Sequence, residues 1–365
     1  MTKIVTVLGA RPQFVKASVV SAVMIKDGRM NEVLVHTGQH FDPNMSEVFF
    51  TDLEMSDPKY HLGISGGNHG EMTGRMLIEV EKVLLSESPD IVLVYGDTNS
   101  TLAGALAAAK LHIPVAHVEA GLRSFNMSMP EEINRILTDQ VSKWLFAPTD
   151  GAVTHLQREG INPSRVHQVG DVMYDVALQH GERASRMKTN AVMRLGLQDK
   201  HYVLATIHRA ENTDDPERLR VIVDAFIETS RHLPVVWPLH PRTRGVLSQT
   251  GMLPAVERAV LLTEPLGYLE IVQLERSAAV IATDSGGVQK EAFFHRVPCV
   301  TLRDETEWVE LVSAGWNALA PPVSPEAIQF AIEAAVGRQG ANVEPYGRGD
   351  AAQRIVRCLA DGLAK

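Results

Sequence analysis

Cysteine is scarce in this sequence: among 365 residues, only Cys299 and Cys358 carry a thiol. A disulfide framework of the kind that stabilises small secreted domains is therefore not expected. No apolar stretch approaches the ~20 residues that a membrane-spanning helix needs. We accordingly expect a cytoplasmic protein without disulfides or a transmembrane segment.

Positive charge is also in short supply, because the formal net charge is -9. A phosphate polymer or an anionic membrane would be repelled on average, which argues against a general nucleic-acid or membrane partner. No spacing of histidine, cysteine and aspartate resembles a closed metal site, so no metal is expected. The G-x-G-x-x-G dinucleotide fingerprint is missing as well, and no cofactor is indicated.

Apolar runs of strand length alternate with helical-period segments, a pattern typical of parallel α/β sheets. The runs are Ile4 to Leu8, Val33 to His36, Ile91 to Tyr95, Val115 to Val118, Leu145 to Ala147, Tyr202 to Ile207, Val235 to Leu239, Val260 to Thr263, Ala279 to Ala282 and Cys299 to Leu302. The fold class expected is α/β, with two Rossmann-like doubly wound domains facing a central cleft. We expect an N-terminal domain over 1–172, with 351–365 packing back on it, and a C-terminal domain over 173–350.

Three acids follow predicted strands of the first half: Asp97, Glu119 and Glu131. Acids at strand ends can transfer protons, so these are candidate acid/base groups. The alternative is structural, with Asp97 capping a helix that begins near Thr98. Glu131 and Glu132 would then simply favour the start of a helix after Pro130.

A turn in the second half, Ser285-Gly286-Gly287, enters a helix after an apolar run. Glycines allow close approach of the backbone, and a helix N-terminus offers free N–H donors, so this turn is a candidate diphosphate site. Glu291 lies nearly two helical turns beyond Ser285, where it could accept hydrogen bonds from ribose hydroxyls. The alternative is an ordinary helix cap with a surface glutamate.

Cationic side chains follow the first strand of each half. Arg11 lies at the end of the first strand and Lys16 about one turn into the next helix, where both could reach a phosphate. In the second half, His208 and Arg209 occupy the corresponding place, and His240 ends another strand. Solvated or capping roles are the alternative for each.

Taken in order along nearly the whole chain, these residues resemble the non-hydrolysing UDP-N-acetylglucosamine 2-epimerases, which have the GT-B architecture. The motifs are Gly9-Ala10-Arg11-Pro12, His36-Thr37-Gly38-Gln39-His40, Gly96-Asp97-Thr98, His117-Val118-Glu119-Ala120-Gly121-Leu122-Arg123, Pro130-Glu131-Glu132-Ile133-Asn134-Arg135, His208-Arg209-Ala210-Glu211-Asn212 and Asp284-Ser285-Gly286-Gly287-Val288-Gln289. The resemblance implies interconversion of UDP-GlcNAc and UDP-ManNAc, by loss and return of UDP through a 2-acetamidoglucal.

The same resemblance implies the role of each candidate residue. The acid/base carboxylates are Asp97, Glu119 and Glu131, with His208 as the active-site histidine. The groups that hold the UDP moiety are Arg11, Lys16, His208, Ser285, Gly286, Gly287 and Glu291. A UDP-sugar is the expected ligand, and a homodimer the expected assembly.

Two departures from the family pattern concern the substrate and its regulation. Thr306-Glu307-Trp308-Val309-Glu310 stands where many members carry Thr-Glu-Arg-Pro-Glu, so Trp308 replaces an arginine that lines the cleft. This form resembles relatives that act on UDP-2,3-diacetamido-2,3-dideoxyglucuronate, an O-antigen precursor. Asp42 and the segment Ser65-Gly66-Gly67-Asn68 replace residues of allosterically activated members, which leaves substrate activation open. A GT-B glycosyltransferase and a non-catalytic nucleotide-sugar sensor are the other readings.

Overall fold

The computed structural model describes residues 1–39, 53, 55–187 and 189–363. The chain divides into two units, the first made of Met1–Val176 with Glu344–Lys365, and the second of Ala177–Val343. His40 and Asp42 lie outside the described residues. The predicted cleft between two domains stays a prediction.

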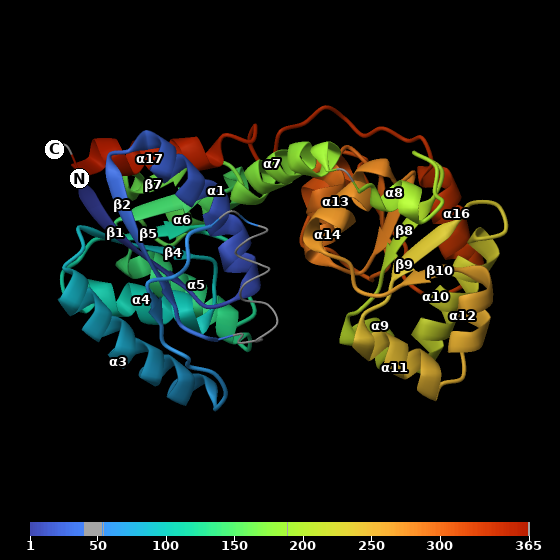
Figure 1. Ribbon diagram of the computed structural model, residues 1–365, viewed down its shortest axis with the longest axis horizontal. Helices are drawn as coiled ribbons and strands as arrows, with labels where there is room; N and C mark the ends of the chain where they lie inside the picture. The colour runs from blue at the N-terminus through green and yellow to red at the C-terminus, as the bar shows by residue number, and fades with distance from the viewer. Residues whose placement is uncertain (40–52, 54, 188, 364–365) are drawn as a thin grey trace. The chain divides into compact units, whose positions relative to one another are not determined.

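The first unit is built on a 7-stranded sheet in which all neighbouring strands are parallel. In spatial order the strands are β3 (Tyr60–His61), β2 (Met30–His36), β1 (Thr2–Leu8), β4 (Ile91–Tyr95), β5 (Val115–Val118), β6 (Trp144–Ala147) and β7 (Val166–Gln168). The helices are α1 (Arg11–Asp27), α3 (His69–Glu87), α4 (Asn99–Lys110), α5 (Pro130–Val141), α6 (Asp150–Arg158), α7 (Val172–Arg186), which continues into the second unit, and α17 (Ala351–Leu363). Figure 1 shows α17 beside α1.

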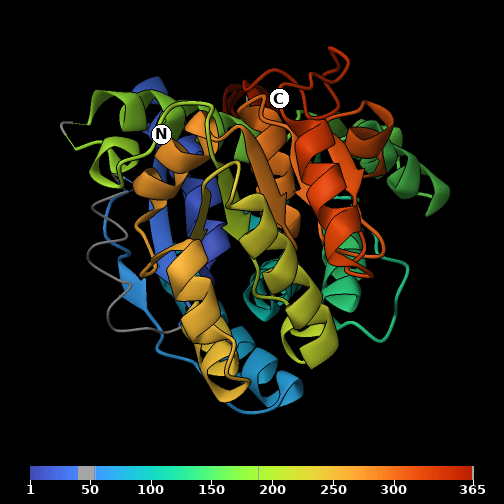
Figure 2. The ribbon, with the colours of Figure 1, turned by 90° about the vertical axis from the view of Figure 1, so that its right-hand side faces the viewer.

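The second unit repeats this architecture with a 6-stranded parallel sheet. Its strands in spatial order are β10 (Leu261–Thr263), β9 (Val235–Pro238), β8 (Val203–Thr206), β11 (Val280–Thr283), β12 (Cys299–Thr301) and β13 (Asn317–Leu319). Its helices are α8 (Ala191–Arg194), α9 (Ala210–Thr213), α10 (Pro216–Thr229), α11 (Pro241–Gln249), α12 (Leu253–Ala259), α13 (Tyr268–Ser277), α14 (Gly286–Phe294), α15 (Val309–Ser313) and α16 (Pro325–Ala335). Figure 2 turns this unit toward the viewer.

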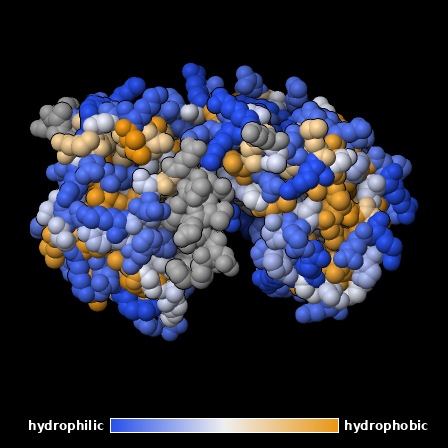
Figure 3. Space-filling view, viewed as in Figure 1, coloured by the Kyte–Doolittle hydropathy of each residue, from blue (hydrophilic) through white to orange (hydrophobic). Residues whose placement is uncertain are grey.

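Burial on both faces explains the apolar runs of the central strands. In β11, Val280 and Ala282 belong to one buried cluster, whereas Ile281 between them belongs to another. Successive side chains of a strand point to opposite faces, so each face of this sheet carries its own core. Polar residues cover most of the viewed surface of each unit, with hydrophobic side chains in smaller patches (Figure 3). The predicted fold class is confirmed.

Three strands were not predicted: β3, β7 and β13. Each lies at the edge of its sheet and includes exposed or half-buried positions. The fourth edge strand, β10, keeps an apolar run and was predicted. An edge strand packs less of its surface into the core and needs no such run, and β3, β7 and β13 have none. The periodicity that revealed the central strands is therefore missing from these segments.

Glu87 at the end of α3 ties together three parts of the first unit. Its carboxylate accepts a hydrogen bond from Lys59 at 2.6 Å, from Tyr60 at 2.5 Å and from Lys3 at 3.1 Å. Only 7% of the side chain is exposed, so solvent screens these contacts weakly. Hydrogen bonds to a charged group of this kind contribute about 1.5–3 kcal/mol each at most.

Replacing Glu87 with glutamine is expected to lower the free energy of unfolding by about 1–3 kcal/mol at pH 7. Lys59 and Tyr60 hold the pKa of Glu87 down to about 2, from an ordinary value of 4.5. The contribution of the ionised form is therefore complete above pH 4.5 and is lost as the pH falls through about 2. Urea unfolding at pH 7 and pH 3 should show a smaller difference between variant and wild type at the lower pH. Glu79→Gln, on the exposed face of α3, is the matched control, and an equal loss at both pH values would contradict the prediction.

Candidate active site

Asp97 follows β4 in a turn that other residues hold in place. Thr98 caps α4, because its Oγ1 accepts a hydrogen bond from the backbone N–H of Thr101, and the alternative that Asp97 caps this helix is wrong. The Asp97 carboxylate instead accepts a hydrogen bond from Arg135 at 2.6 Å. Its backbone carbonyl accepts one from Asn134 at 2.9 Å. With a third of the side chain exposed, the carboxylate remains open to a ligand.

Glu119 follows β5 in the left-handed region of backbone space, with φ at 73°. A non-glycine residue in this region is strained and persists only where its surroundings hold it. Its carboxylate forms an ion pair with Lys16 of α1, and about a tenth of each side chain is exposed. Burial by itself lowers the pKa of Lys16, but Glu119, with Asp171 and Asp97, outweighs burial and raises that pKa above its usual 10.5. Lys16 is therefore a fixed cation beside Glu119.

Glu131 and Glu132 both lie in the first turn of α5, but their surroundings differ. Glu132 is buried and accepts hydrogen bonds from the backbone N–H groups of Ser124 and Phe125, at 2.9 and 2.8 Å. Glu131 is half-buried and lines a cavity. The helix start thus uses one carboxylate to fix the preceding loop and leaves the other facing the cavity.

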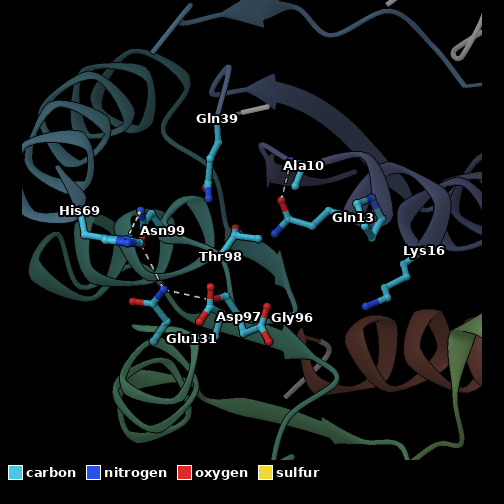
Figure 4. A pocket seen from close by; sticks show the side chains of 12 residues that line it. Ala10, Gln13, Lys16, Gln39, His69, Gly96, Asp97, Thr98, Asn99 and Glu131 are labelled. Atoms are coloured by element: carbon cyan, nitrogen blue, oxygen red, sulfur yellow. Dashed lines mark hydrogen bonds between the residues drawn. The ribbon is translucent and has the colours of Figure 1, made fainter. Parts of the chain in front are cut away.

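That cavity, of about 250 Å³, lies entirely within the first unit (Figure 4). It brings together Lys16, Asp97 and Glu131 of the predicted site, and Glu119 adjoins it through Lys16. The remaining lining residues are Ala10, Pro12, Gln13, Gln39, His69, Gly96, Thr98, Asn99 and Asn134. Arg11, the first residue of α1, is exposed and does not line the cavity.

Sequence reasoning missed several polar groups of this cavity. His69 begins α3, and its Nδ1 lies 3.3 Å from the side-chain amide of Asn99. Asn99 in turn accepts a hydrogen bond from Asn134. Gln39 accepts hydrogen bonds from the backbone and the hydroxyl of Ser100. Gln39 and Asn134 belong to motifs that carry the resemblance, which is the signal that could have found them.

In the second unit, Ser285 occupies the N-cap position of α14 without a side-chain capping bond. Its hydroxyl is therefore not committed to the helix, contrary to the ordinary-cap alternative. Gly286 and Gly287 form the first turn, where the N–H groups of an α-helix have no partner within the helix. Such a turn can hold an anion.

Glu291 is half-buried in the same helix, so the surface-glutamate alternative is wrong. Tyr268 donates a hydrogen bond to its carboxylate at 3.3 Å. Burial raises the pKa of Glu291, although Tyr268 and Lys290 partly oppose this. A buried carboxylate of this kind gains from further hydrogen-bond donors.

His208 is placed beside the Ser285 turn by a buried aspartate. Asp284 accepts hydrogen bonds from the backbone N–H groups of His208 and Arg209, at 3.2 and 3.0 Å. The His208 ring is about half exposed, and its Nδ1 lies 3.6 Å from Asp284. His240 caps α11, because its Nδ1 accepts a hydrogen bond from the backbone of Arg242. Only His208 of these two histidines is thus tied to the Ser285 turn.

Trp308 packs on the first turn of α14. Its indole N–H donates a hydrogen bond to the carbonyl of Gly286 at 2.8 Å, and the Lys290 ammonium lies 4.5 Å from the ring centroid. The side chain is half-buried, so it does not belong to the closed core of the unit. A substitution at Trp308 therefore alters the contacts of Gly286 at the candidate anion site.

Over residues 1–39, 53, 55–187 and 189–363, no group of three histidine, cysteine, aspartate or glutamate residues could hold a metal ion. Within the same residues, no helix combines the length and the apolar character that crossing a membrane requires.

Comparison with known proteins bears on the whole chain. A family model described as UDP-N-acetylglucosamine 2-epimerase matches residues 23–360. The UDP-2,3-diacetamido-2,3-dideoxy-D-glucuronate 2-epimerase of Pseudomonas aeruginosa is 54% identical over 365 residues, covering 98% of this chain and 99% of that protein. The UDP-N-acetylglucosamine 2-epimerase of Methanocaldococcus jannaschii is 44% identical, covering 99% of both chains. The crystal structure of Methanocaldococcus jannaschii UDP-GlcNAc 2-epimerase in complex with UDP-GlcNAc and UDP matches with a TM-score of 0.84 and 44% identity, covering 99% of this chain and 100% of that one.

Proposed function

Because the chain belongs to the UDP-N-acetylglucosamine 2-epimerase family, whose members are isomerases of UDP-sugars, we propose that it interconverts UDP-GlcNAc and UDP-ManNAc. The observation that supports this most directly is the cluster of acids around one cavity of the first unit. Lys16, Asp97 and Glu131 line that cavity, and Glu119 is paired with Lys16.

The chemistry must solve one problem, which is the low acidity of the sugar C2–H. This carbon is not next to a carbonyl, so direct removal of its proton would leave an unstabilised carbanion. If the C1–O bond to UDP breaks first, oxocarbenium character at C1 acidifies C2–H. A carboxylate can then take the proton and leave a 2-acetamidoglucal with UDP. Return of a proton to the other face of C2, and of UDP to C1, yields the epimer.

We assign the proton transfers to the first unit. A proton leaves one face of C2 and another returns to the opposite face, so at least two positioned groups are required. Asp97, Glu119 and Glu131 are the candidates for these two roles. Lys16 orients the Glu119 carboxylate through their ion pair, and Arg135 orients that of Asp97 through a hydrogen bond of 2.6 Å. Both carboxylates are thereby held in fixed positions for proton transfer.

We assign the departing diphosphate to the second unit. The Ser285-Gly286-Gly287 turn offers helix N–H donors, and His208 lies beside it through Asp284. These donors would stabilise the charge that grows on UDP as the C1–O bond breaks. Glu291 is assigned to the ribose, and Arg11 of the first unit adds positive charge for the phosphates.

The test is a product assay in deuterated water, followed by NMR, with UDP-GlcNAc as the only sugar. Two UDP-sugars in a constant ratio, with deuterium at C2 of the product, are expected, because the abstracted proton exchanges before it returns. A glycosyltransferase would leave a donor without acceptor largely unchanged, and a sensor would bind without turnover. Retention of the original hydrogen at C2 would rule out the acid/base scheme.

A second candidate substrate is UDP-2,3-diacetamido-2,3-dideoxyglucuronate, an intermediate of O-antigen synthesis. It is favoured by the 54% identity to the Pseudomonas aeruginosa enzyme that bears this name, and by Trp308. The same assay with both sugars in parallel separates the candidates, since the physiological substrate should show the higher kcat/KM.

Replacing Trp308 with arginine is expected to change the ratio of kcat/KM for the two sugars by about fivefold, the equivalent of ~1 kcal/mol. Trp308 contacts Gly286 at the proposed diphosphate site, and arginine would put a charged five-donor fork where an indole face stands. Trp308→Phe, which keeps the aromatic face over Lys290, is the matched control and should leave the ratio within about twofold. Parallel losses on both sugars in Trp308→Arg would assign Trp308 to packing instead.

We further propose that the enzyme is a cytoplasmic homodimer. A stripe of exposed apolar side chains four residues apart runs from the N-cap of α5 along the helix, formed by Met129, Ile133, Leu137 and Val141. Exposed apolar stripes of this kind are typical of surfaces that bind another protein. Light scattering should report twice the 40.0 kDa mass of one chain.

A further inference from the structure

His117 lies in β5 with both ring nitrogens engaged and no exposed surface. Its Nε2 lies 2.8 Å from the backbone carbonyl of Gly96. Its Nδ1 lies 2.7 Å from Oδ1 of Asp139, a residue of α5 that is also fully buried. The ring therefore bridges the residue that follows β4 and the last turn of α5.

The partners of the ring determine which of its nitrogens carry protons. A backbone carbonyl only accepts hydrogen bonds, so Nε2 must donate to Gly96. The other oxygen of Asp139 already accepts from the Gly121 backbone at 3.1 Å and from Arg123 at 2.7 Å, which favours an ionised carboxylate. An ionised carboxylate also only accepts, so Nδ1 must donate as well. Both nitrogens carrying protons make His117 an imidazolium.

Arg123 holds the Asp139 carboxylate from the side opposite the ring. It donates to Asp139 at 2.7 Å and also binds the exposed Glu159 through two hydrogen bonds of 2.7 Å. A cation in contact with a carboxylate favours its ionised form, in agreement with the ionised Asp139 inferred from the hydrogen bonds.

Asp139 and His117 together contact the turns that present two of the candidate acids. Gly96, directly before Asp97, is bound through its carbonyl by His117 and through its N–H by Val118 at 3.0 Å. Gly121, two residues after Glu119, is bound through its N–H by Asp139. The strained backbone of Glu119 thus lies between two anchored points, its strand and Gly121.

We propose that the His117 imidazolium and Asp139 form a positioning pair, which fixes the Asp97 and Glu119 turns relative to each other for the proton transfers. This inference rests on the proposed function. Neither side chain lines the cavity, so the pair acts through the backbone of the two turns. Small displacements of positioned groups, of about 1 Å, can reduce turnover about 10²-fold.

The protonation state can be tested without any substrate. In protein labelled with ¹⁵N-histidine at pH 7.5, the signals of His117 are identified by their absence from His117→Phe. Each ring nitrogen of His117 is expected to show a directly bonded proton. A ring nitrogen without a proton would overturn the imidazolium assignment, whatever the outcome of the activity assays.

Turnover tests the positioning role. His117→Phe is expected to lower kcat roughly 10²-fold, and Asp139→Asn roughly tenfold, because a neutral ring could still donate to Gly96. KM and UDP affinity should stay within about twofold in both variants. His167→Phe, the same substitution in edge strand β7 of the same sheet, is the control and should keep kcat within about twofold.

The signals of the remaining histidines report whether each variant is folded. If His117→Phe does not fold, the kcat of Asp139→Asn tests the positioning role instead. A folded variant of the pair with wild-type kcat would overturn the positioning role. Failure of the wild type to epimerise either sugar would instead refute the proposed function and leave the NMR result standing.

Discussion

Replacing Asp97, Glu119 or Glu131 with its amide is expected to lower kcat by roughly 10²-fold or more, the scale for loss of a positioned acid or base. An amide has nearly the same shape as the acid but cannot take up a proton at neutral pH. UDP affinity should change by no more than about twofold, because the diphosphate donors assigned to the second unit are untouched.

The measurement is kcat and KM for each variant with UDP-GlcNAc, together with UDP affinity by calorimetry. Glu81→Gln, an exposed acid on α3, is the control that tests for general damage. The kcat of Glu132→Gln is compared with that of Glu131→Gln. Glu132 binds the backbone of the preceding loop and does not line the cavity, whereas Glu131 does. Wild-type turnover in all three amide variants would show that the acid/base assignment is wrong.

Replacing Lys16 with methionine is expected to have the second large effect, in both stability and turnover. The substitution leaves the Glu119 carboxylate buried without its cation, and loss of one partner of a buried ion pair costs about 3–5 kcal/mol. Turnover should fall roughly 10²-fold, because the Glu119 carboxylate would no longer be held in its orientation by Lys16.

A double-mutant cycle separates the two effects. In Lys16→Met with Glu119→Gln, no charge is left unpaired at this position, so much of the lost stability should return. Turnover should not return, since the acid itself is gone. Urea unfolding and kcat are measured for the wild type, both single variants and the double variant. Additive losses of stability would mean that the two side chains do not act as a pair.

The sequence predicted the central strands and two of the three acids for the same physical reason, whereas Glu131 follows no strand directly and begins α5. Parallel strands such as Ile91–Tyr95 are buried on both faces, so they are continuous apolar runs, and the residues that follow them lie at one edge of the sheet. Asp97 and Glu119 could therefore be found by position alone. The edge strands Tyr60–His61, Val166–Gln168 and Asn317–Leu319 lack the run and were missed.

The sequence could not predict which partner each polar side chain contacts. Glu131 and Glu132 are adjacent and chemically alike, yet only the first lines the cavity. Lys16, which we expect to hold a phosphate of UDP, also pairs with Glu119, a contact between residues 103 positions apart that the sequence did not indicate. Such partners are decided by side-chain directions in three dimensions, which a spacing argument does not contain.

The first unit is discontinuous in sequence, and this has a consequence for how the protein is made. Its last segment, Glu344–Lys365, follows the whole second unit, and Asp175 holds the start of α17 through the backbone N–H groups of Ala351 and Ala352. During synthesis, residues 177–343 leave the ribosome before α17 can cover α1. The second unit can therefore complete its fold first, while part of the core of the first unit is still exposed to water. Chaperones that bind the chain during translation should accordingly bind the N-terminal residues, although these are synthesised earliest.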